Sequence, residues 1–363
     1  MFDTIIGTFE GYKMRKEKKL FGFTIVFTML ISILLYLTTK TPILTTLGVA
    51  VEANDKAGQE KILENIRDGQ RVVILYGMNN QEFDHTIDVV YDTPDFYWLD
   101  MKYRALSIGD LHILALGQKY ADIEYLDNLI DEKTDEVLKE LITDSMDDFE
   151  KTLKIHDWIC DHVRYMETYN DGDQEVYGAL IEKRARCAGY AKLFTIMLDK
   201  VGIKSEVISG ESLDDGEKVP HAWNLVYMDG KPYYFDITWD DNDEIGWNHH
   251  WFAVTQKEFS KTHFPSQGYD WNYDANYTEH NYYLRNNMYL EKYYYKYISN
   301  MINQYGKNFS LKFENADLMN HAIEMITNQT ELKKIMRESN MTYVKQITYE
   351  MSEGVNCLHL QFQ

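Results

Sequence analysis

A tight turn near the middle of the chain most constrains how it can fold. Asp229-Gly230 separates two runs rich in strand-forming residues, HAWNLVYM and KPYYFDIT. Such a dipeptide between two strands predicts a two-residue hairpin loop, because both loop residues must adopt positive φ. The pairing of the strands is then fixed, with Met228 opposite Lys231. The sequence therefore predicts an antiparallel hairpin over this region.

The pairing decides which side chains share a face of the hairpin. Counted back from the turn, Trp223 lies opposite Asp236, and His221 lies opposite Thr238. His221 and Asp236 become diagonal neighbours, within reach of each other for long side chains. A loop one residue longer or shorter would put them on opposite faces, so this prediction depends on the Asp-Gly turn.

A helix is predicted to begin at Cys187. Its apolar positions recur at helical spacing and a glycine follows as a stop. These residues are Cys187, Ala191, Phe194, Leu198 and Val201, followed by Gly202. A helix N-terminus carries unpaired N–H groups and partial positive charge, which lower a thiol pKa and can bind a developing oxyanion. Arg184 and Arg186, just before the helix, act in the same direction.

Cys187, His221 and Asp236 follow one another in an order that suits a nucleophilic cysteine. A thiol attacks a carbonyl as thiolate, so it needs a base within hydrogen-bond reach, and the base needs a group that orients its ring. Each residue alone has an ordinary explanation, since a cysteine at a helix start is more often a small buried residue than a nucleophile. The combination of helix start, hairpin pairing and chain order favours a catalytic triad.

The segments around these residues resemble a known family. YGALIEKRARCAGYAKLFTIMLDKVGIKSEVISG, followed by HAWNLVYMDGKPYYFDITWDD, is similar to the transglutaminase-like (papain-like) core of cysteine enzymes, in its bacterial surface-protein branch. The similarity runs from Asp147 to Pro265 and is most specific at Cys-x-Gly-Tyr-Ala, His-Ala-Trp and Asp-x-Thr-Trp. It implies an α+β fold in which a helix bearing the cysteine packs on an antiparallel sheet bearing the histidine and the aspartate.

The resemblance also implies a role for each residue. Cys187 is the nucleophile, His221 the general base and acid, and Asp236 the residue that orients the imidazole. Relatives often carry an acidic residue directly after the cysteine, where this chain has Ala188, so its substrate preference could differ. The oxyanion donor beyond the backbone N–H of Cys187 has no fixed spacing in this family, and Tyr177 is a candidate.

The composition of the chain limits the classes of molecule that the protein is expected to bind. The 363 residues are 45% hydrophobic and 14% aromatic, enough for real cores, and the formal net charge of −21 leaves no basic footprint for nucleic acid. Cationic or neutral partners are favoured, although net acidity mostly serves solubility.

The other two cysteines predict no disulfide framework: Cys160 belongs to the apolar face of a helix, and Cys357 to a short terminal strand where it is expected to be half-exposed.

The N-terminal region predicts a membrane anchor. The chain has no charged residue from Leu20 to Leu37, a length that can cross a bilayer, and five basic residues at positions 13–19 precede this run. Positive residues stay inside, so the bulk of a single-pass protein would lie outside the cytoplasm. The alternative is a signal peptide cleaved near residues 49–53, but the long gap between the apolar run and these small residues favours an uncleaved anchor.

The chain divides into seven predicted parts. They are a cytoplasmic basic segment (1–19), a transmembrane anchor (20–38), a linker (39–60), an N-terminal α/β region (61–145), the transglutaminase-like core (146–265), a tyrosine-rich connection (266–300) and a small α+β appendage (301–363). The N-terminal region is expected to contain a helix at KILENIRDG and strands at RVVILYG and DLHILALG. The appendage is expected to run strand, helix with a break, strand, strand.

Several segments permit more than one interpretation. The acidic stretch ESLDDGEKVP before His221 is expected to be either a mobile loop that attracts a substrate amine or a solvated hairpin or crossover loop. The dense tyrosines between Tyr269 and Tyr297 could line a groove for sugars or peptide, but more often such a run packs a connection onto a domain. His249, His250 and His263 match no zinc pattern, and the acidic loop has no calcium ligand spacing, so neither a metal nor a cofactor is predicted.

The resulting hypothesis is a membrane-anchored, extracytoplasmic acyl-transfer enzyme that acts on amide bonds. Its substrate would be a protein or peptide, such as a cell-surface or cell-wall peptide, and water as the second nucleophile would make it a peptidase or amidase. Two alternatives stay open. A lysine amine as second nucleophile would make it a crosslinking transglutaminase, and retention of the fold without chemistry would make it a surface binding module.

Overall fold

A computed structural model describes residues 51–52, 56–166, 171–214, 216–241, 246–269, 271, 274–339 and 341–363. The chain forms two compact units, one built from residues up to Phe83 together with Lys102–Gly117, and one from Asp84–Met101 together with Gln118–Gln363. The apolar run at 20–38 lies outside the described residues. Among the helices that are described, none combines the length and apolar character needed to span a bilayer.

The first unit contains a four-stranded sheet of order β1-β2-β4-β3. Its strands are β1 (Val51–Glu52), β2 (Val72–Tyr76), β3 (Leu99–Ile108) and β4 (Leu111–Gln118), and helix α2 spans Lys56–Arg67. Val73 and Leu75 of β2 are buried, as are Leu114 and Leu116 of β4, which is the alternation expected of half-buried strands. The predicted helix and both predicted strands are confirmed. Helix α3 (Asn80–Asp92) and strand β3 connect this unit to the second.

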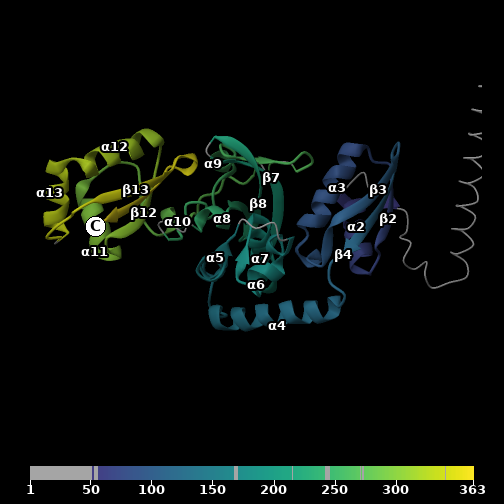
Figure 1. The fold of residues 1–363 in the computed structure, drawn as a ribbon. Helices are drawn as coiled ribbons and strands as arrows, with labels where there is room; N and C mark the ends of the chain where they lie inside the picture. Colours follow the sequence, from purple (N-terminus) through teal and green to yellow (C-terminus); the bar gives the residue numbers. More distant parts are fainter. Residues whose placement is uncertain are drawn as a thin grey trace, which may run out of the picture. The chain divides into compact units, whose positions relative to one another are not determined.

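The second unit carries the predicted core as a four-stranded sheet of order β10-β7-β8-β9, with every neighbouring pair antiparallel. Helix α7 lies against β7 and β8 (Figure 1). The strands are β7 (Ser205–Asp214), β8 (Glu217–Met228), β9 (Lys231–Phe235) and β10 (His263–Pro265). The helices are α4 (Ile123–Leu141), α5 (Asp148–His162), α6 (Val176–Leu180), α7 (Cys187–Lys200), α8 (Ile237–Asp240) and α9 (Gln256–Phe259). Two short strands, β5 (Arg164–Tyr165) and β6 (Arg184–Ala185), pair with each other as a separate two-stranded sheet.

Polar contacts fix helix α7 on the sheet. The Asn224 side chain of β8 donates from Nδ2 to the carbonyl of Ala191 at 2.9 Å and to the hydroxyl of Thr195 at 3.0 Å. On the same helix, Lys192 Nζ lies 2.8 Å from Glu175 Oε2, and both side chains are buried. Because buried polar groups are costly unless they are paired, these contacts stabilise the observed placement of the helix.

The predicted hairpin is confirmed, with one correction. Asp229 and Gly230 have φ of 50° and 73°, and the strands pair from Met228↔Lys231 to Asn224↔Phe235. The second strand ends at Phe235, three residues before Thr238, since Asp236 accepts a hydrogen bond from the backbone N–H of Trp239 and caps helix α8. Thr238 is therefore helical, and the predicted pairing of His221 with Thr238 is wrong.

The acidic segment before His221 is not a long loop. Strands β7 and β8 stay paired as far as Asp214↔Glu217, so ESLDDGEKVP forms the end of a hairpin. Of the two interpretations left open by the sequence, the hairpin is the correct one.

The C-terminal part of the second unit is built on another four-stranded sheet, of order β11-β12-β14-β13. From Asn308 the predicted order of strand, broken helix, strand and strand is confirmed, and Asn328 makes the break because it ends one helix and caps the next. The elements are α10 (Tyr282–Arg285), β11 (Tyr289–Leu290), α11 (Tyr295–Tyr305), β12 (Asn308–Phe313), α12 (Ala316–Thr327), α13 (Gln329–Glu338), β13 (Ile347–Ser352) and β14 (Cys357–Phe362).

One hydrophobic core runs through this part and the β10-β7-β8-β9 sheet. Trp223 and Phe259 belong to the same buried cluster as Leu311 and Leu358. The tyrosine-rich connection packs against this cluster, through residues such as Tyr269, Tyr282, Tyr293, Tyr295 and Tyr297. The packing interpretation of the tyrosines is thus supported. The expected half-exposure of Cys357 is wrong, because strand β14 is covered on both faces and this cysteine is 0% exposed.

Candidate functional site

Cys187 is the first residue of helix α7, as predicted. It packs in a small buried cluster with Val207 of β7 and Ala222 of β8, and 8% of its surface is exposed. The first N–H groups of a helix have no acceptor within the helix, so they are available to a negative charge that forms beside the thiol. The position thus combines a shielded sulfur with an electropositive backbone.

His221 and Asp236 meet as the hairpin predicted. Nε2 of His221 donates to Oδ2 of Asp236 at 2.7 Å, and both side chains are buried. Burial by itself would lower the pKa of His221, but the charge and hydrogen bond of Asp236, with a further bond to Cys187, raise it to about 10. Burial would raise the pKa of Asp236, but the charge and hydrogen bond of His221 hold it well below its ordinary value.

The thiol of Cys187 completes this arrangement. Burial alone would raise its pKa, yet the hydrogen bond and charge of His221, together with the backbone N–H of Ala222, lower it below the ordinary value. Because Nε2 of His221 is bonded to Asp236, the ring nitrogen left for the sulfur is Nδ1. The structure therefore brings Cys187, His221 and Asp236 together in one hydrogen-bonded chain that favours thiolate and imidazolium.

The other two cysteines have the opposite electrostatics. Burial raises the pKa of Cys160 to about 11 and that of Cys357 to about 12. All three cysteines are free and buried, so burial does not distinguish them. The contact with an imidazole that is held by a carboxylate is what sets the Cys187 thiol apart.

A second histidine contacts the same carboxylate oxygen of Asp236 as His221 does. Nε2 of His263, on strand β10, lies 3.0 Å from Oδ2 of Asp236, and its Nδ1 lies 2.9 Å from the hydroxyl of Thr262. The ring is fully buried and stacks on Phe259 at a centroid distance of 3.8 Å. Burial lowers the pKa of His263 although Asp236 opposes this, so the ring is a neutral donor. This contact could not be predicted from the sequence, since a three-residue strand carries no usable periodicity.

Gly210 allows strand β10 to approach the site. It pairs with His221 on β8 and with Pro265 on β10. A Cβ at this position would lie 2.3 Å from the carbonyl oxygen of Phe264 and 2.6 Å from the Trp223 ring. Only glycine leaves room for this close packing, which positions His263 against Asp236.

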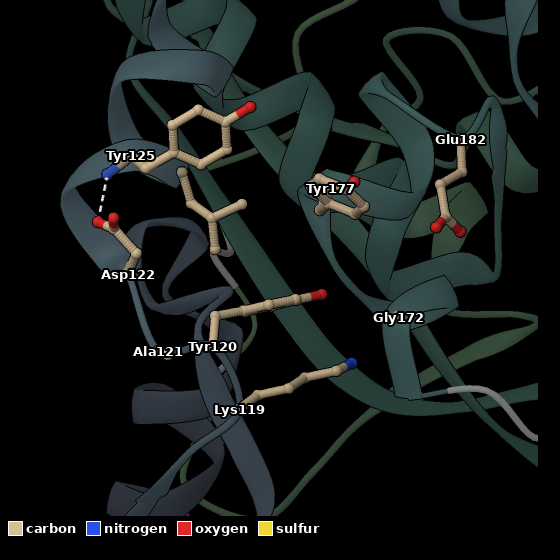
Figure 2. A pocket seen from close by; sticks show the side chains of 9 residues that line it. Lys119, Tyr120, Ala121, Asp122, Tyr125, Gly172, Tyr177 and Glu182 are labelled. Carbon is tan, nitrogen blue, oxygen red and sulfur yellow. Dashed lines mark hydrogen bonds between the residues drawn. The ribbon is translucent and has the colours of Figure 1, made fainter.

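Tyr177, the candidate oxyanion donor, lines a separate cavity of about 450 Å³ (Figure 2). Its ring lies 5.9 Å from that of Tyr120, between centroids, and the lining also includes Lys119, Tyr125 and Glu182. These contacts give Tyr177 a place in the cavity wall. The oxyanion role stays a prediction.

A cysteine at the start of a helix, packed on an antiparallel sheet whose hairpin holds a histidine and an aspartate, is the arrangement of papain-like thiol enzymes. Residues 135–250 match the family model of the transglutaminase-like superfamily, so this part of the chain is a transglutaminase-like domain. The match contains all three residues of the hydrogen-bonded chain.

Curated relatives agree with this family. The chain is 28% identical over 151 residues to kyphoscoliosis peptidase of Homo sapiens and 27% identical over 150 residues to that of Mus musculus. Each alignment covers 36% of this chain and 23% of the relative, so the chain spans less than a quarter of those proteins.

Among solved structures, one similar chain is a proposed cysteine protease from Cytophaga hutchinsonii, with 13% identity and a TM-score of 0.29. The alignment covers 46% of this chain and 66% of the Cytophaga chain. Another is a TGase with 13% identity, a TM-score of 0.27, and coverage of 55% of this chain and 56% of that one.

Proposed function

We propose that this protein is a cysteine acyl-transfer enzyme that hydrolyses amide bonds in proteins or peptides, with Cys187, His221 and Asp236 as its triad. The hydrogen-bonded chain from the thiol through the imidazole to the buried carboxylate carries the proposal. A thiolate beside an imidazolium is both a nucleophile and a proton donor in one pair, which is what amide cleavage needs.

The proposed reaction begins when the Cys187 thiolate attacks the amide carbonyl carbon and forms a tetrahedral intermediate. The negative charge on its oxygen is stabilised by the backbone N–H of Cys187 at the helix start. His221 gives its proton to the leaving nitrogen as the C–N bond breaks, and a thioester remains on Cys187. Asp236 holds the ring in the orientation required for this transfer.

The second half regenerates the enzyme. Neutral His221 takes a proton from water, and the hydroxide formed attacks the thioester carbonyl. The C–S bond breaks, the carboxylic acid leaves, and the thiolate and imidazolium form again. A primary amine in place of water would give a new amide bond, so the same residues would also serve crosslinking. Hydrolysis is favoured because the curated relatives are described as peptidases.

The two reactions are separated by their products. The full chain is incubated with a mixture of glutamine-containing peptides and an excess of a primary amine, and the products are analysed by mass spectrometry. Peptide cleavage supports the peptidase, whereas gain of the amine with loss of ammonia shows a transglutaminase.

Two variants make this assay specific. Cys187→Ala should abolish either product, and Cys160→Ala, which removes another buried thiol of the same domain, should retain it. A wild-type protein that gives neither product with any peptide of the mixture would indicate a binding module.

The proposed location is the outer face of a membrane, with the segment 20–38 as a single-pass anchor. The support is the uncharged run from Leu20 to Leu37 and the basic residues before it. External protease added to intact cells should degrade the transglutaminase-like domain and spare an epitope tag at the N-terminus. Protection of the domain would contradict this orientation.

A further inference from the structure

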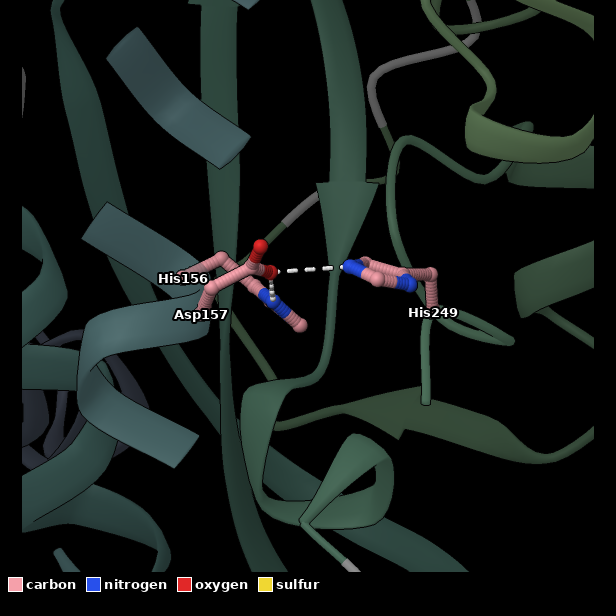
Figure 3. Close-up of side chains that lie close together, drawn as sticks. All are labelled: His156, Asp157 and His249. Carbon is pink, nitrogen blue, oxygen red and sulfur yellow. Dashed lines mark hydrogen bonds and ion pairs between the residues drawn. The ribbon is translucent and has the colours of Figure 1, made fainter. Parts of the chain in front are cut away.

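A second cluster of titratable side chains lies apart from the proposed triad. His156 and Asp157 of helix α5 converge with His249, which follows helix α8 in the chain (Figure 3). Asp157 Oδ1 lies 3.1 Å from Nδ1 of His156 and 2.8 Å from Nε2 of His249. All three atoms lie within 4.8 Å of one another. Two imidazole nitrogens and one carboxylate oxygen thus converge, although His249 is far from the other two residues in the sequence.

A buried carboxylate holds the far side of His156. Nε2 of this ring lies 3.1 Å from Oδ2 of Asp240, and both side chains are at most 1% exposed. Asp240 is itself fixed, because its Oδ1 accepts the backbone N–H of Trp251 at 2.9 Å. A histidine that binds a metal through one nitrogen commonly donates its other N–H to a carboxylate, which sets the tautomer and orients the ring. His156 has this second partner.

Aromatic packing holds the ring of His249. It stacks on Tyr282 with centroids 3.7 Å apart and an angle of 10° between the planes, and the Trp247 ring meets it edge to face at 5.3 Å. The indole N–H of Trp247 donates to Asp161 of helix α5 at 2.6 Å. Both imidazoles are therefore held in place before any ligand binds, which reduces the entropy lost on binding.

We propose that His156 Nδ1, Asp157 Oδ1 and His249 Nε2 bind a divalent transition metal, with Zn²⁺ as the best match. Two histidines and one carboxylate form a common three-ligand set for this ion, with water as the fourth ligand. Bond lengths of about 2.0–2.1 Å in a tetrahedral site put ligand atoms about 3.3 Å apart, so the separations of 3.1 Å and 2.8 Å that Asp157 Oδ1 makes with the two ring nitrogens need to open by only a few tenths of an ångström. The side chain of Asp157 is 27% exposed, which gives the ion and its water a route to solvent.

The metal would replace a proton. In the structure both ring nitrogens of His156 face carboxylates, which requires a proton on each. On binding, Nδ1 loses its proton to solvent and takes the metal, while Nε2 keeps its bond to Asp240. His249 moves its single proton from Nε2 to Nδ1. The local charge then rises by one, because two positive charges are added and one proton leaves.

The position of the cluster indicates a structural role. Asp240 lies in helix α8, which Asp236 caps, and the backbone N–H of Asp240 donates to the carbonyl of Asp236 at 3.2 Å. A metal bound by His156 and Asp157 of helix α5 and by His249, which follows α8, would join these two segments. It would thereby stabilise the turn that carries the carboxylate of Asp236. This inference does not depend on the proposed amide chemistry, since the ligands lie outside the triad.

Calorimetric titration of the full chain with ZnCl₂, after removal of metals with EDTA, tests the site. We expect one Zn²⁺ per chain. Asp157→Asn and His249→Gln should each weaken binding at least tenfold. His162→Gln is the matched control, because His162 lies on the same helix and is exposed. Equal weakening in all three variants, or absence of binding to the wild type, would overturn the proposal.

Two further measurements keep the test decisive if the variants fail to fold. Co²⁺ bound to the wild type should give the intense visible absorption of a four-coordinate site, whereas the weak spectrum of a six-coordinate ion would contradict it. Protein whose Cys187 has been alkylated should bind Zn²⁺ as before. Loss of binding on alkylation would place the metal at the thiol and overturn the assignment.

Discussion

Nε2 of His221 donates to Oδ2 of Asp236 at 2.7 Å, and this single bond decides which nitrogen of the ring faces the thiol. With Nε2 occupied, Nδ1 is left for Cys187. The carboxylate also keeps the imidazole charged, which in turn lowers the pKa of the Cys187 thiol. The reactivity of the sulfur therefore depends on an aspartate that it does not touch.

Asp236→Asn should lower kcat/KM for peptide cleavage by on the order of 10²–10⁴, as removal of the orienting charge does in other triads. The side chain keeps its size and can still cap helix α8, so the fold should survive. The pKa of His221 should fall, and the pKa of the Cys187 thiol should rise because its cationic partner is lost. Steady-state kinetics and circular dichroism measure the two effects, and an active Asp236→Asn enzyme would show that the carboxylate has no role.

His263→Phe should reduce kcat about tenfold, within the range for a positioning group, and leave KM nearly unchanged. The phenyl ring can still stack on Phe259, but the N–H to Asp236 is gone. That bond helps to keep the pKa of Asp236 low, so its loss raises this pKa, and the acid limb of the activity profile should move to higher pH. His263→Gln, which restores a donor, should recover part of the activity. A variant with lower stability and an unchanged pH profile would indicate a packing role alone.

Gly210→Ala should destabilise the protein by about 1–3 kcal/mol, because the added methyl group meets the backbone of Phe264 and the ring of Trp223. Activity should fall further than stability alone accounts for, since strand β10 carries His263. Gly216→Ala is the comparison: its φ is +82° but nothing lies within 4 Å, so it should cost about 1 kcal/mol and leave activity intact. Urea denaturation and peptide cleavage give the two readouts, and equal activity of both variants would contradict this account.

Lys192→Met should destabilise the domain by about 3–5 kcal/mol, because Glu175 is left buried without its partner. Replacement of both residues, as Lys192→Met with Glu175→Leu, should recover most of this loss, since an apolar pair needs no desolvation. Urea denaturation of the two variants measures the difference. A double variant as unstable as the single one would show that Glu175 is not the source of the cost.

Local signals made the triad geometry predictable from the sequence. The Asp229-Gly230 turn sets the register that brings His221 to Asp236, and helical spacing places Cys187 at a helix start. Contacts made by distant segments gave no such signal. His263 reaches Asp236 through a three-residue strand, and His156 and His249 lie 93 positions apart in the chain.

Burial was harder to predict than secondary structure. The alternation in the strand of Cys357 suggests one apolar face and therefore predicts a half-exposed cysteine. The strand lies inside its sheet, between β12 and β13, and both of its faces are buried. Alternation identifies a strand but does not tell whether the second face is also covered. The end of strand β9 is ambiguous in the sequence for a related reason, because an aspartate at this position can either continue the strand or cap the next helix.

The rate of alkylation of each cysteine by iodoacetamide, measured between pH 5 and pH 10 by peptide mass mapping, tests the central claim most directly. Cys187 should react well below the ordinary thiol pKa, while Cys160 and Cys357, with pKa values near 11 and 12, should stay unmodified at neutral pH. In His221→Ala, burial of Cys187 is opposed only by the backbone N–H of Ala222, so its pKa should rise and its advantage should vanish. A Cys187 that reacts no faster than the other two at neutral pH, or that is unaffected by loss of His221, would contradict the account.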